Sequence, residues 1–447
     1  MSISFPTRLV WRGDERYEQT RRETLWHAGL PNRFPAVIVQ AIDVNDVVAA
    51  IHLARDRGLQ LSVRSGGHSW AGTFLRDNVV LLDISRLRDF SIDREAMTGS
   101  AQPGLKGSEL DKILMAQGLW FPTGHCTNVC LGGYLLQGGF GWNGREYGPA
   151  CMSVIGVELV TAEGEVCYAD EKQNADLFWA ARGAGPGFFA VVTRFHIKVY
   201  PRSLVTMNNT YVYPAEVFEE LYRWAHEIGR ATPAEIHMML LRDDSASTAG
   251  PITILSATAF AGGEEEARAT LSLFEACPAR KRAVVAEVNR PTTTVELTAL
   301  GTDRHFDATK RYVADNIWTH ATFDDLLPGL QQIVGSFPPA PTFMEWMNWG
   351  YDHEPPRQAN MAYSLEDDFH FSLYTAWDNP ADDAKFVGWT TERLRQLEPL
   401  STGTQLADEN LINRPVRFVS DENLRRLDAL RTRYDPQGIF VSWLGRP

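Results

Sequence analysis

The chain has 447 residues, a formal net charge of -13 and a hydrophobic fraction of 44%. This length allows two domains with separate hydrophobic cores, and this composition is typical of a globular protein rather than of a disordered chain. The excess of acidic side chains repels the phosphates of nucleic acids and of anionic lipids, so we expect neither nucleic acid nor membrane as a partner.

The sequence shows no pattern typical of export or of membrane insertion. The first 13 residues lack a basic segment followed by an apolar one, and no run approaches the roughly 18 apolar residues of a membrane-spanning helix. The five cysteines are sparse and odd in number, which favours free thiols in a reducing compartment. We therefore expect a cytoplasmic protein.

Short strands and helices alternate over the first 200 residues. Runs of β-branched and apolar residues predict strands at 36–41, 61–64, 79–83, 154–161, 165–168 and 188–199. Helical spacing of apolar residues predicts helices at 44–58 and 107–117. In the first of these helices Asn45 is a candidate N-terminal cap and Gly58 a candidate end.

The pattern changes after Pro201. Strands are predicted at 206–212, 237–241, 252–260, 343–349 and 369–377, and helices at 214–230, 264–277, 323–335, 381–397 and 424–434. Several of these strands alternate in polarity, which favours an antiparallel sheet with one covered face. We expect an α+β protein with a first domain at 1–203, a second at 204–403 and a C-terminal segment, 404–447, that returns to the first.

A glycine-containing loop follows the strand at 61–64. Its sequence is Val63-Arg64-Ser65-Gly66-Gly67-His68-Ser69-Trp70. The two glycines permit backbone angles closed to other residues and leave N–H groups free to converge on an anion, and Arg64 and Ser65 are further donors. Such a loop could hold a pyrophosphate. The alternative is a glycine turn in which His68 is a buried packing residue.

A second glycine-rich segment runs from Phe121 to Gly141 and has almost no charge. Six glycines lie within 18 residues, namely Gly124, Gly132, Gly133, Gly138, Gly139 and Gly141. This density predicts neither a helix nor a packed strand, and fits backbone lying close against a flat ligand. His125, Cys126 and Cys130 could suggest a metal site. No second pair of ligands follows at metal-binding spacing, so we predict no metal.

Together, these segments resemble the FAD-linked oxidases of the vanillyl-alcohol oxidase superfamily, and within it the berberine bridge enzyme-like group. The resemblance rests on the loop at 64–69, the segment at 124–141, Arg145-Glu146-Tyr147-Gly148, the stretch 174–183 and Tyr434-Asp435-Pro436. These matches follow the family's order from about Phe34 to the end of the chain.

The resemblance implies a PCMH-type FAD-binding domain, with its core at about 31–203, and a separate substrate domain. It implies that FAD is attached by two covalent bonds, from His68 to the flavin 8α-methyl group and from Cys126 to flavin C6. Cys130 stands where the family usually has glycine and receives no such role. The implied cofactor-binding residues are Arg64, Ser65, Gly66, Gly67, His68, Ser69, Cys126, Val129, Gly132, Gly133, Gly138, Gly139, Gly141 and Tyr147.

The resemblance also implies hydride transfer from a C–OH or C–NH carbon of a small molecule, such as an alcohol, a sugar or an amine. A small residue at the position of Val129 is typical of members that react with O2, so an oxidase that forms H2O2 is favoured. The alternative interpretation of Val129 is that its side chain only packs against its neighbours. The alternatives are a dehydrogenase that uses another acceptor and a flavoprotein that sequesters a metabolite or drug without catalysis.

The proton acceptor is not defined by the motifs. Many relatives have a tyrosine ahead of the final helix, and Gln405 stands near that position here. The remaining candidates are Tyr134, Asp408 and Glu409, with Asn348, Tyr363, His370 and Tyr374 on or near the strands of the second domain. For each of them a solvated or packed side chain is the competing interpretation.

Trp70 and Phe140 match positions that flank the active site. The aromatic strand at 343–349, with Trp346 and Trp349, could face a substrate or the backing helices.

Overall fold

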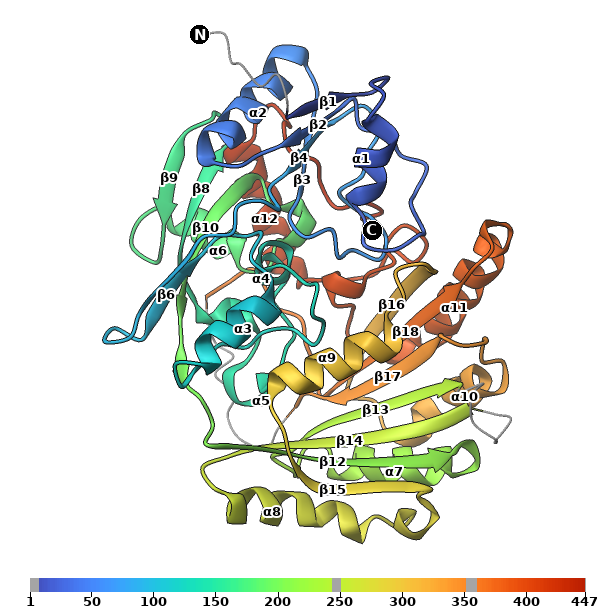
Figure 1. Ribbon diagram of the computed structural model, residues 1–447. Coiled ribbons are helices and arrows are strands. Elements are labelled where there is room, and N and C mark those ends of the chain that lie inside the picture. Colours follow the sequence, from blue (N-terminus) through green and yellow to red (C-terminus); the bar gives the residue numbers. More distant parts are fainter. Residues whose placement is uncertain (1–7, 243–250, 351–359, 447) are drawn as a thin grey trace.

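The computed structural model describes residues 8–242, 251–350 and 360–446. Figure 1 shows two halves, one built from the N-terminal and C-terminal parts of the chain and the other from a broad sheet in the middle of the sequence. The expected α+β class is confirmed. No helix in the described ranges is both long and apolar enough to cross a lipid bilayer.

The first half contains a four-stranded sheet, a five-stranded sheet and a short antiparallel pair of β7 (Leu119–Trp120) and β11 (Tyr200–Pro201). The four-stranded sheet has the order β1 (Leu9–Trp11), β2 (Val37–Gln40), β4 (Val80–Asp83), β3 (Leu61–Arg64). Its last three strands are parallel, and α2 (Val44–Arg57) connects β2 to β3. The five-stranded sheet is antiparallel, with the order β5 (Phe90–Asp93), β6 (Thr98–Ala101), β10 (Ala190–Lys198), β8 (Val154–Thr161), β9 (Val166–Ala169). β3 ends where the loop at 64–69 begins.

The N-terminal cap of α2 differs from the expected one. Asp43, not Asn45, precedes the helix in an extended conformation and accepts a hydrogen bond from the Asp46 N–H at 3.0 Å. Asn45 lies inside the first turn and is exposed. Gly58 ends the helix as expected, because its φ of 60° is left-handed and favours glycine.

The second half is a seven-stranded antiparallel sheet. Its order is β15 (Val285–Pro291), β12 (Val205–Pro214), β14 (Pro251–Ala261), β13 (Glu235–Arg242), β17 (Phe343–Asn348), β18 (Phe369–Trp377), β16 (Arg311–Thr319). One face packs against α7 (Phe218–Ile228), α8 (Glu264–Ser272), α10 (Phe323–Gly335) and α11 (Asp383–Leu397). The other face turns toward the first half, with α9 (Thr294–His305) between them (Figure 1).

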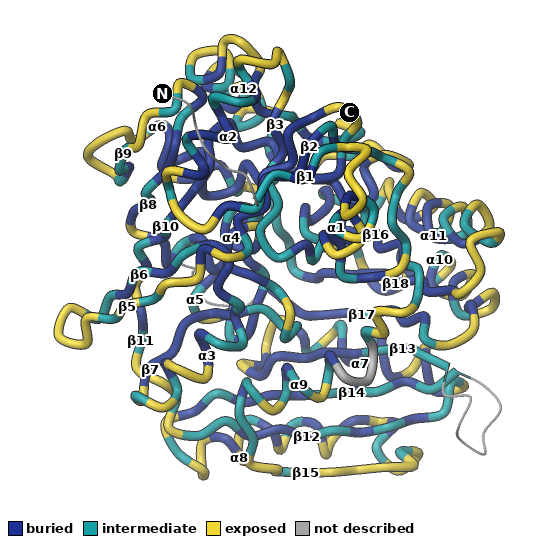
Figure 2. Tube along the Cα trace, turned by 45° about the horizontal axis from the view of Figure 1, so that its top comes forward, coloured by how far each residue is buried: buried dark blue, intermediate teal, exposed yellow. Residues whose placement is uncertain are grey.

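The shorter helices complete the architecture. They are α1 (Tyr17–Glu23), α3 (Gly107–Met115), α4 (Leu131–Leu136), α5 (Gly144–Tyr147) and α6 (Ala175–Ala181). β15, α9 and β16 were not among the expected elements. Figure 2 shows most strands buried, whereas exposed residues gather at the β5–β6 turn and on β15 at the outer edge of the large sheet.

Each half has its own hydrophobic core. One core takes its residues from 37–199 and 406–443 and includes Ala362, whereas the other takes its residues from 207–397. α12 (Asp421–Tyr434) and the chain after it lie against the first half, where the Leu61 N–H donates to the Ile439 carbonyl at 2.7 Å. The end of the chain therefore completes the half that contains its beginning.

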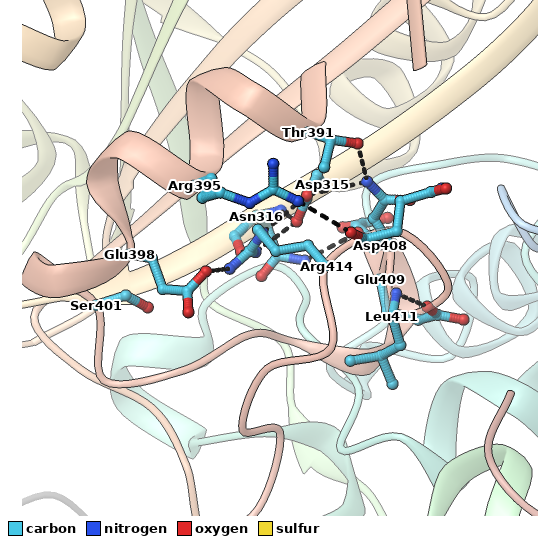
Figure 3. A network of polar contacts seen from close by, with 12 residues as sticks. Asp315, Asn316, Thr391, Arg395, Glu398, Ser401, Asp408, Glu409, Leu411 and Arg414 are labelled. Carbon is cyan, nitrogen blue, oxygen red and sulfur yellow. Dashed lines mark hydrogen bonds and ion pairs between the residues drawn. The ribbon is translucent and has the colours of Figure 1, made fainter. Parts of the chain in front are cut away.

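A buried polar network attaches this C-terminal segment to β16 (Figure 3). Arg414 and Asp315 form an ion pair with 2.5 Å between Nη2 and Oδ1, and their side chains are only 2% and 1% exposed. The Asn316 side chain donates to the carbonyls of Gln405 and Asp408 at 2.9 Å and accepts from the Gln405 N–H at 2.7 Å. The Asn316 side chain thus binds the backbone at both ends of the segment 405–408 and fixes this segment to the large sheet.

We expect Asp315→Asn to destabilise the protein by about 3 kcal/mol, because it removes the buried counter-charge of Arg414 and leaves only the half-exposed Glu398, at 3.8 Å. Urea denaturation followed by fluorescence measures the change in the free energy of unfolding. Asp428→Asn is the matched control, since it removes the partner of Arg446 at sites that are 41% and 32% exposed, and we expect it to cost at most about 1 kcal/mol. Equal losses in the two variants would contradict the structural role of the buried pair.

Candidate active site

A cavity of about 370 Å³ lies between the two halves. We call it the central cavity. Its wall combines the loop at 64–69 (the His68 loop), the segment at 124–141 (the Cys126 loop), side chains of β13, β14 and β17, and the C-terminal segment. The sequence-predicted site residues that line it are Arg64, Ser65, Gly66, Gly67, His68, Ser69, Cys126, Val129, Gly132, Gly133, Gly139, Tyr134 and Asp408. Trp70, Phe140, Tyr374 and Gln405 line it as well.

The His68 loop presents its backbone to the cavity. Among the described residues, the N–H groups of Gly66, Gly67, His68 and Ser69 donate to no protein acceptor. Gly67 has a φ of +72°, and a Cβ atom there would overlap the Thr24 carbonyl oxygen. Free N–H groups on such a turn are suited to binding an anion, as the sequence motif predicts.

The two polar side chains at the start of the loop have other roles. Arg64 forms an ion pair with Asp83 at 2.8 Å and also donates to the Thr24 and Gly66 carbonyls at 3.0 and 3.2 Å. The Ser65 hydroxyl donates to the Pro103 carbonyl at 2.6 Å. These bonds hold the loop in shape, so the backbone N–H groups are the donors left for a ligand.

The His68 ring is held between aromatic side chains. It stacks on Trp26 with 4.7 Å between ring centroids and 4° between the ring planes, and the Trp70 ring lies edge-on at 5.9 Å. Burial lowers the pKa of His68 to about 4. The imidazole is therefore neutral at pH 7, with a nitrogen lone pair free for bonding.

The Cys126 loop contains a short helix, contrary to the expectation that its glycines exclude one. α4 includes Gly132, where a Cβ atom would lie 2.7 Å from the Ser65 Oγ atom and 2.9 Å from the Pro103 side chain. The glycine is needed because the helix packs directly on the His68 loop. Glycine is therefore required here for close packing of the two loops, and not only where the backbone has to approach a ligand.

The two cysteines of this segment have different surroundings. Both Cys126 and Cys130 line the cavity, and burial raises the pKa of each thiol. The Cys130 thiol donates to the Gly104 carbonyl at 3.3 Å, and a Cβ atom on Gly66 would lie 2.6 Å from the Cys130 sulfur. Cys130 thus packs beneath the His68 loop.

Four of the predicted site residues lie outside the cavity wall. Gly138 packs against the Tyr363 ring, and Gly141 against the Thr123 carbonyl. Tyr147 packs between Trp120 and Tyr200, with ring centroids 4.9 and 4.3 Å away. The fourth residue, Glu409, is buried, and accepts from the Leu411 N–H at 2.6 Å.

Asp408 and Glu345 are the carboxylates among the described residues of the cavity wall. The Trp70 indole N–H donates to Asp408 Oδ1 at 2.5 Å, and the Tyr374 hydroxyl donates to Oδ2 at 3.0 Å. Burial raises the pKa of Asp408 to about 6. By contrast, the Tyr134 hydroxyl donates to the Pro122 carbonyl at 2.7 Å, and burial raises its pKa well above the ordinary value.

The other candidates from the second half have hydrogen-bonding or packing roles within that half. The Asn348 side chain accepts from the Ile236 N–H at 2.7 Å and donates to the Gly229 carbonyl at 2.9 Å. His370 lies 3.2 Å from the Ser372 hydroxyl behind the Phe140 ring. Trp346 packs against Tyr222 of α7, as the interpretation of a strand facing the helices predicts.

Sequence reasoning missed His125, His237 and Glu345 as lining residues. His237 and Glu345 lie on the neighbouring strands β13 and β17, and 3.6 Å separates His237 Nδ1 from Glu345 Oε1. A signal for His237 and Glu345 was present, because each is an ionisable residue with apolar neighbours on both sides in its strand.

Comparisons with known proteins agree with this geometry. A family model described as FAD binding domain matches residues 35–170. The FAD-linked oxidoreductase nodO of Hypoxylon pulicicidum is 31% identical over 97% of this chain and 97% of its own length. The chain belongs to the FAD-linked oxidoreductases. A solved structure described as BBE-like 1 of Physcomitrella patens has the same fold, with a TM-score of 0.84 at 20% identity, covering 98% of this chain and 97% of the other.

Solved structures show the same fold. A 6-hydroxy-D-nicotine oxidase from Arthrobacter nicotinovorans superposes with a TM-score of 0.82 at 21% identity, covering 98% of this chain and 97% of the other. An isoleucine-to-valine variant of Phl p 4, described as a glucose oxidase, gives 0.83 at 19% identity, covering 99% and 97%. Wild-type Phl p 4.0202 is described as a glucose dehydrogenase and gives 0.81 at 18% identity, covering 99% and 97%.

The residues of the central cavity fit FAD. The His68 loop offers unpaired backbone N–H groups suited to a pyrophosphate, and the glycines of both loops allow close approach of a flat ring. The cavity also reaches Gly185 and Pro186 and the strand β10, as an elongated cofactor requires. FAD would therefore lie along the seam between the two loops.

We expect Gly67→Ala to lower the flavin content of the purified protein severely, because the new methyl group overlaps the Thr24 carbonyl and strains a left-handed backbone. The ratio of flavin absorbance to protein absorbance measures the loss. Gly388→Ala in α11 is the matched control, since a Cβ atom there meets nothing within 4 Å. Normal flavin content in Gly67→Ala would contradict the assigned role of the His68 loop.

Proposed function

We propose that the protein is an oxidase that removes hydride from a C–OH or C–NH carbon of a small organic substrate, using FAD as acceptor and O2 as oxidant, with H2O2 as product. The observation that supports this most is the placement of Asp408. It puts a buried carboxylate with a pKa of about 6 on the wall of the cavity that His68 and Cys126 also line. FAD supplies the acceptor for the hydride and reacts with O2.

Two covalent bonds to FAD, through His68 and Cys126, are part of this proposal. Both residues line the cavity, each on a different loop, and α4 packs the two loops together through Gly132. Trp26 fixes the plane of the His68 ring, and the neutral ring has a lone pair available for bonding. Cys130 has its thiol directed to the Gly104 carbonyl, which supports Cys126 as the second tether.

We expect acid-denatured protein to stay yellow and to yield a flavin that joins the peptides containing His68 and Cys126. Mass spectrometry of the digested protein identifies the linked peptides. Cys126→Ala should retain flavin on the His68 peptide alone, whereas Cys130→Ala, the matched control, should retain both bonds. Release of free FAD from the wild-type protein would exclude covalent attachment.

Asp408 is the proton acceptor in this proposal. Loss of hydride from a carbon that bears OH or NH requires a base near that heteroatom, and a base with a pKa near the working pH is the most effective. The Trp70 and Tyr374 donors orient the carboxylate, and the Asn316 side chain holds its backbone. Gln405, near the position of a tyrosine in many relatives, accepts from the Ala407 N–H and so shapes the turn that presents Asp408.

Val129 supports O2 as the oxidant. It lines the cavity within the Cys126 loop, where a small side chain leaves space next to the bound ring. The descriptions of the two Phl p 4 structures also link a valine substitution to oxidase activity and the wild-type protein to dehydrogenase activity. An oxidase is therefore proposed over a dehydrogenase.

The cavity wall favours a substrate with a flat or apolar part. Aromatic side chains recur along it, including Trp70, Phe140, Trp142, Phe306, Phe343 and Tyr374. Such surfaces bind rings of amines and faces of sugars alike. Aromatic alcohols, cyclic amines and oligosaccharides are accordingly the first compounds to screen, with peroxide as the readout.

With a substrate from this screen, we expect Asp408→Asn to slow flavin reduction by about 10²–10⁴-fold. In the wild type the rate should fall about tenfold per pH unit below pH 6, because the carboxylate must be ionised to accept a proton. Stopped-flow absorbance under anaerobic conditions measures this half-reaction, and the variant should lose the acidic limb. An unchanged rate and pH profile in Asp408→Asn would exclude it as the base.

The second half-reaction is the internal control. Chemically reduced wild type and Asp408→Asn should both reoxidise rapidly in air-saturated buffer, since this step does not involve the base. Slow reoxidation of the wild type would favour the dehydrogenase. Tight binding of screened compounds without any flavin reduction would favour a sequestering flavoprotein.

A further inference from the structure

Three ionisable side chains converge at one end of the central cavity. They are His125 of the Cys126 loop and Glu235 and His237 of β13, and one potential ligand atom from each lies within 4.8 Å of those from the others. Glu235 and His237 point to the same face of the strand because they are two residues apart. The fold thus brings together a histidine from one half of the molecule and two donors from the other.

Each of the three side chains has a buried polar atom without a hydrogen-bond partner in the described part of the chain. These atoms are His125 Nε2, Glu235 Oε2 and His237 Nε2. Glu235 and His237 are only 4% and 8% exposed, and 4.0 Å separates their unpartnered atoms, which is too long for a hydrogen bond. Buried polar atoms of this kind are costly, and three at one place point to a missing shared partner.

The remaining polar atoms of the cluster are oriented by neighbours. His237 Nδ1 faces Glu345 Oε1 at 3.6 Å, and Glu235 Oε1 accepts from the Gly144 N–H at 3.1 Å. The His125 ring lies edge-on to Trp142 with 4.5 Å between centroids. Histidine ligands of metals usually have a carboxylate near the ring nitrogen that does not bind the metal, as His237 has Glu345, and carboxylate ligands are usually hydrogen-bonded as well, as Glu235 is. Such neighbours fix the tautomer and the orientation of the ligand.

We propose that His125, Glu235 and His237 bind a divalent transition-metal ion, with zinc as the best match. Two imidazole nitrogens and one carboxylate oxygen are a common zinc donor set, and such three-ligand sites keep a fourth position open. His125 and His237 line the central cavity, so that position is accessible to water or to an oxygen or nitrogen of a bound small molecule. The ion would satisfy all three unpartnered atoms at once.

A hydrogen-bonded chain is the competing arrangement. In it His237 would bridge Glu235 and Glu345, which requires the 4.0 Å separation to close and leaves His125 Nε2 without a partner. The metal site accounts for all three atoms, whereas the chain accounts for two. The sequence did not indicate this metal site, because His125 lies 110 positions before Glu235 and the three residues form no motif with metal-binding spacing.

Zinc binding by the full-length, flavin-containing protein tests the proposal. After treatment with a chelator, titration with Zn²⁺ against a chromogenic chelator should show one tightly bound ion per chain, and elemental analysis should confirm it. Glu235→Gln and His237→Gln should each weaken binding by roughly 100-fold or more, and Glu345→Gln by about 10–100-fold through loss of ring orientation. Co²⁺ in place of Zn²⁺ should give d–d absorption bands that these ligand variants lose.

Two matched controls isolate the site. His320→Gln alters a histidine paired with Asp367 at 2.6 Å on the surface, and Cys126→Ala removes the neighbouring thiol; both should retain the ion. No stoichiometric zinc in the wild type would overturn the proposal, and so would equal affinity in the wild type and in Glu235→Gln. Loss of the ion in Cys126→Ala would also overturn it, by assigning the metal to the thiol. Flavin absorbance and thermal unfolding verify that each variant is folded.

Discussion

The buried ion pair between Asp315 and Arg414 is the constraint on which the arrangement of the site depends. Asp315 lies on β16, the strand at one edge of the large sheet, and Arg414 lies in the C-terminal segment that returns to the first half. Next to this pair, the Asn316 side chain holds the backbone of Gln405 and Asp408 (Figure 3). A charge pair of this kind is tolerated in the interior only when both partners are present, so it fixes where the two halves meet.

Close packing of the two glycine-rich loops is the second constraint. Gly66 lies against Cys130, and Gly132 lies against Ser65, so a single added carbon at either position would push the loops apart. This contact sets His68 and Cys126 on the wall of one cavity although 58 positions separate them in the chain. The arrangement of FAD therefore depends on small residues as much as on polar donors.

The described part of the cavity wall has two carboxylates that come from different parts of the chain. Asp408 is held by Trp70 and Tyr374 near the C-terminal segment, whereas Glu345 and His237 lie on the central strands of the large sheet. Glu345 is among the groups that raise the pKa of Asp408, after burial, so the two carboxylates interact.

Local patterns of glycine, strand and loop residues were enough to indicate the α+β class, the two glycine-rich loops and the FAD-linked family, and they predicted His68 and Cys126 as site residues, both of which line the central cavity. The sequence also suggested Asp408, though only among several candidates of equal standing. It was misleading at two positions: Asp43 rather than Asn45 caps α2, and Gly132 lies in a helix. Only the tertiary structure decided that Asp408 faces the cavity and Glu409 does not, and that His125 meets Glu235 and His237. The physical reason is that these contacts join segments far apart in the chain, and their geometry follows from sheet register and buried polar partners that no local pattern specifies.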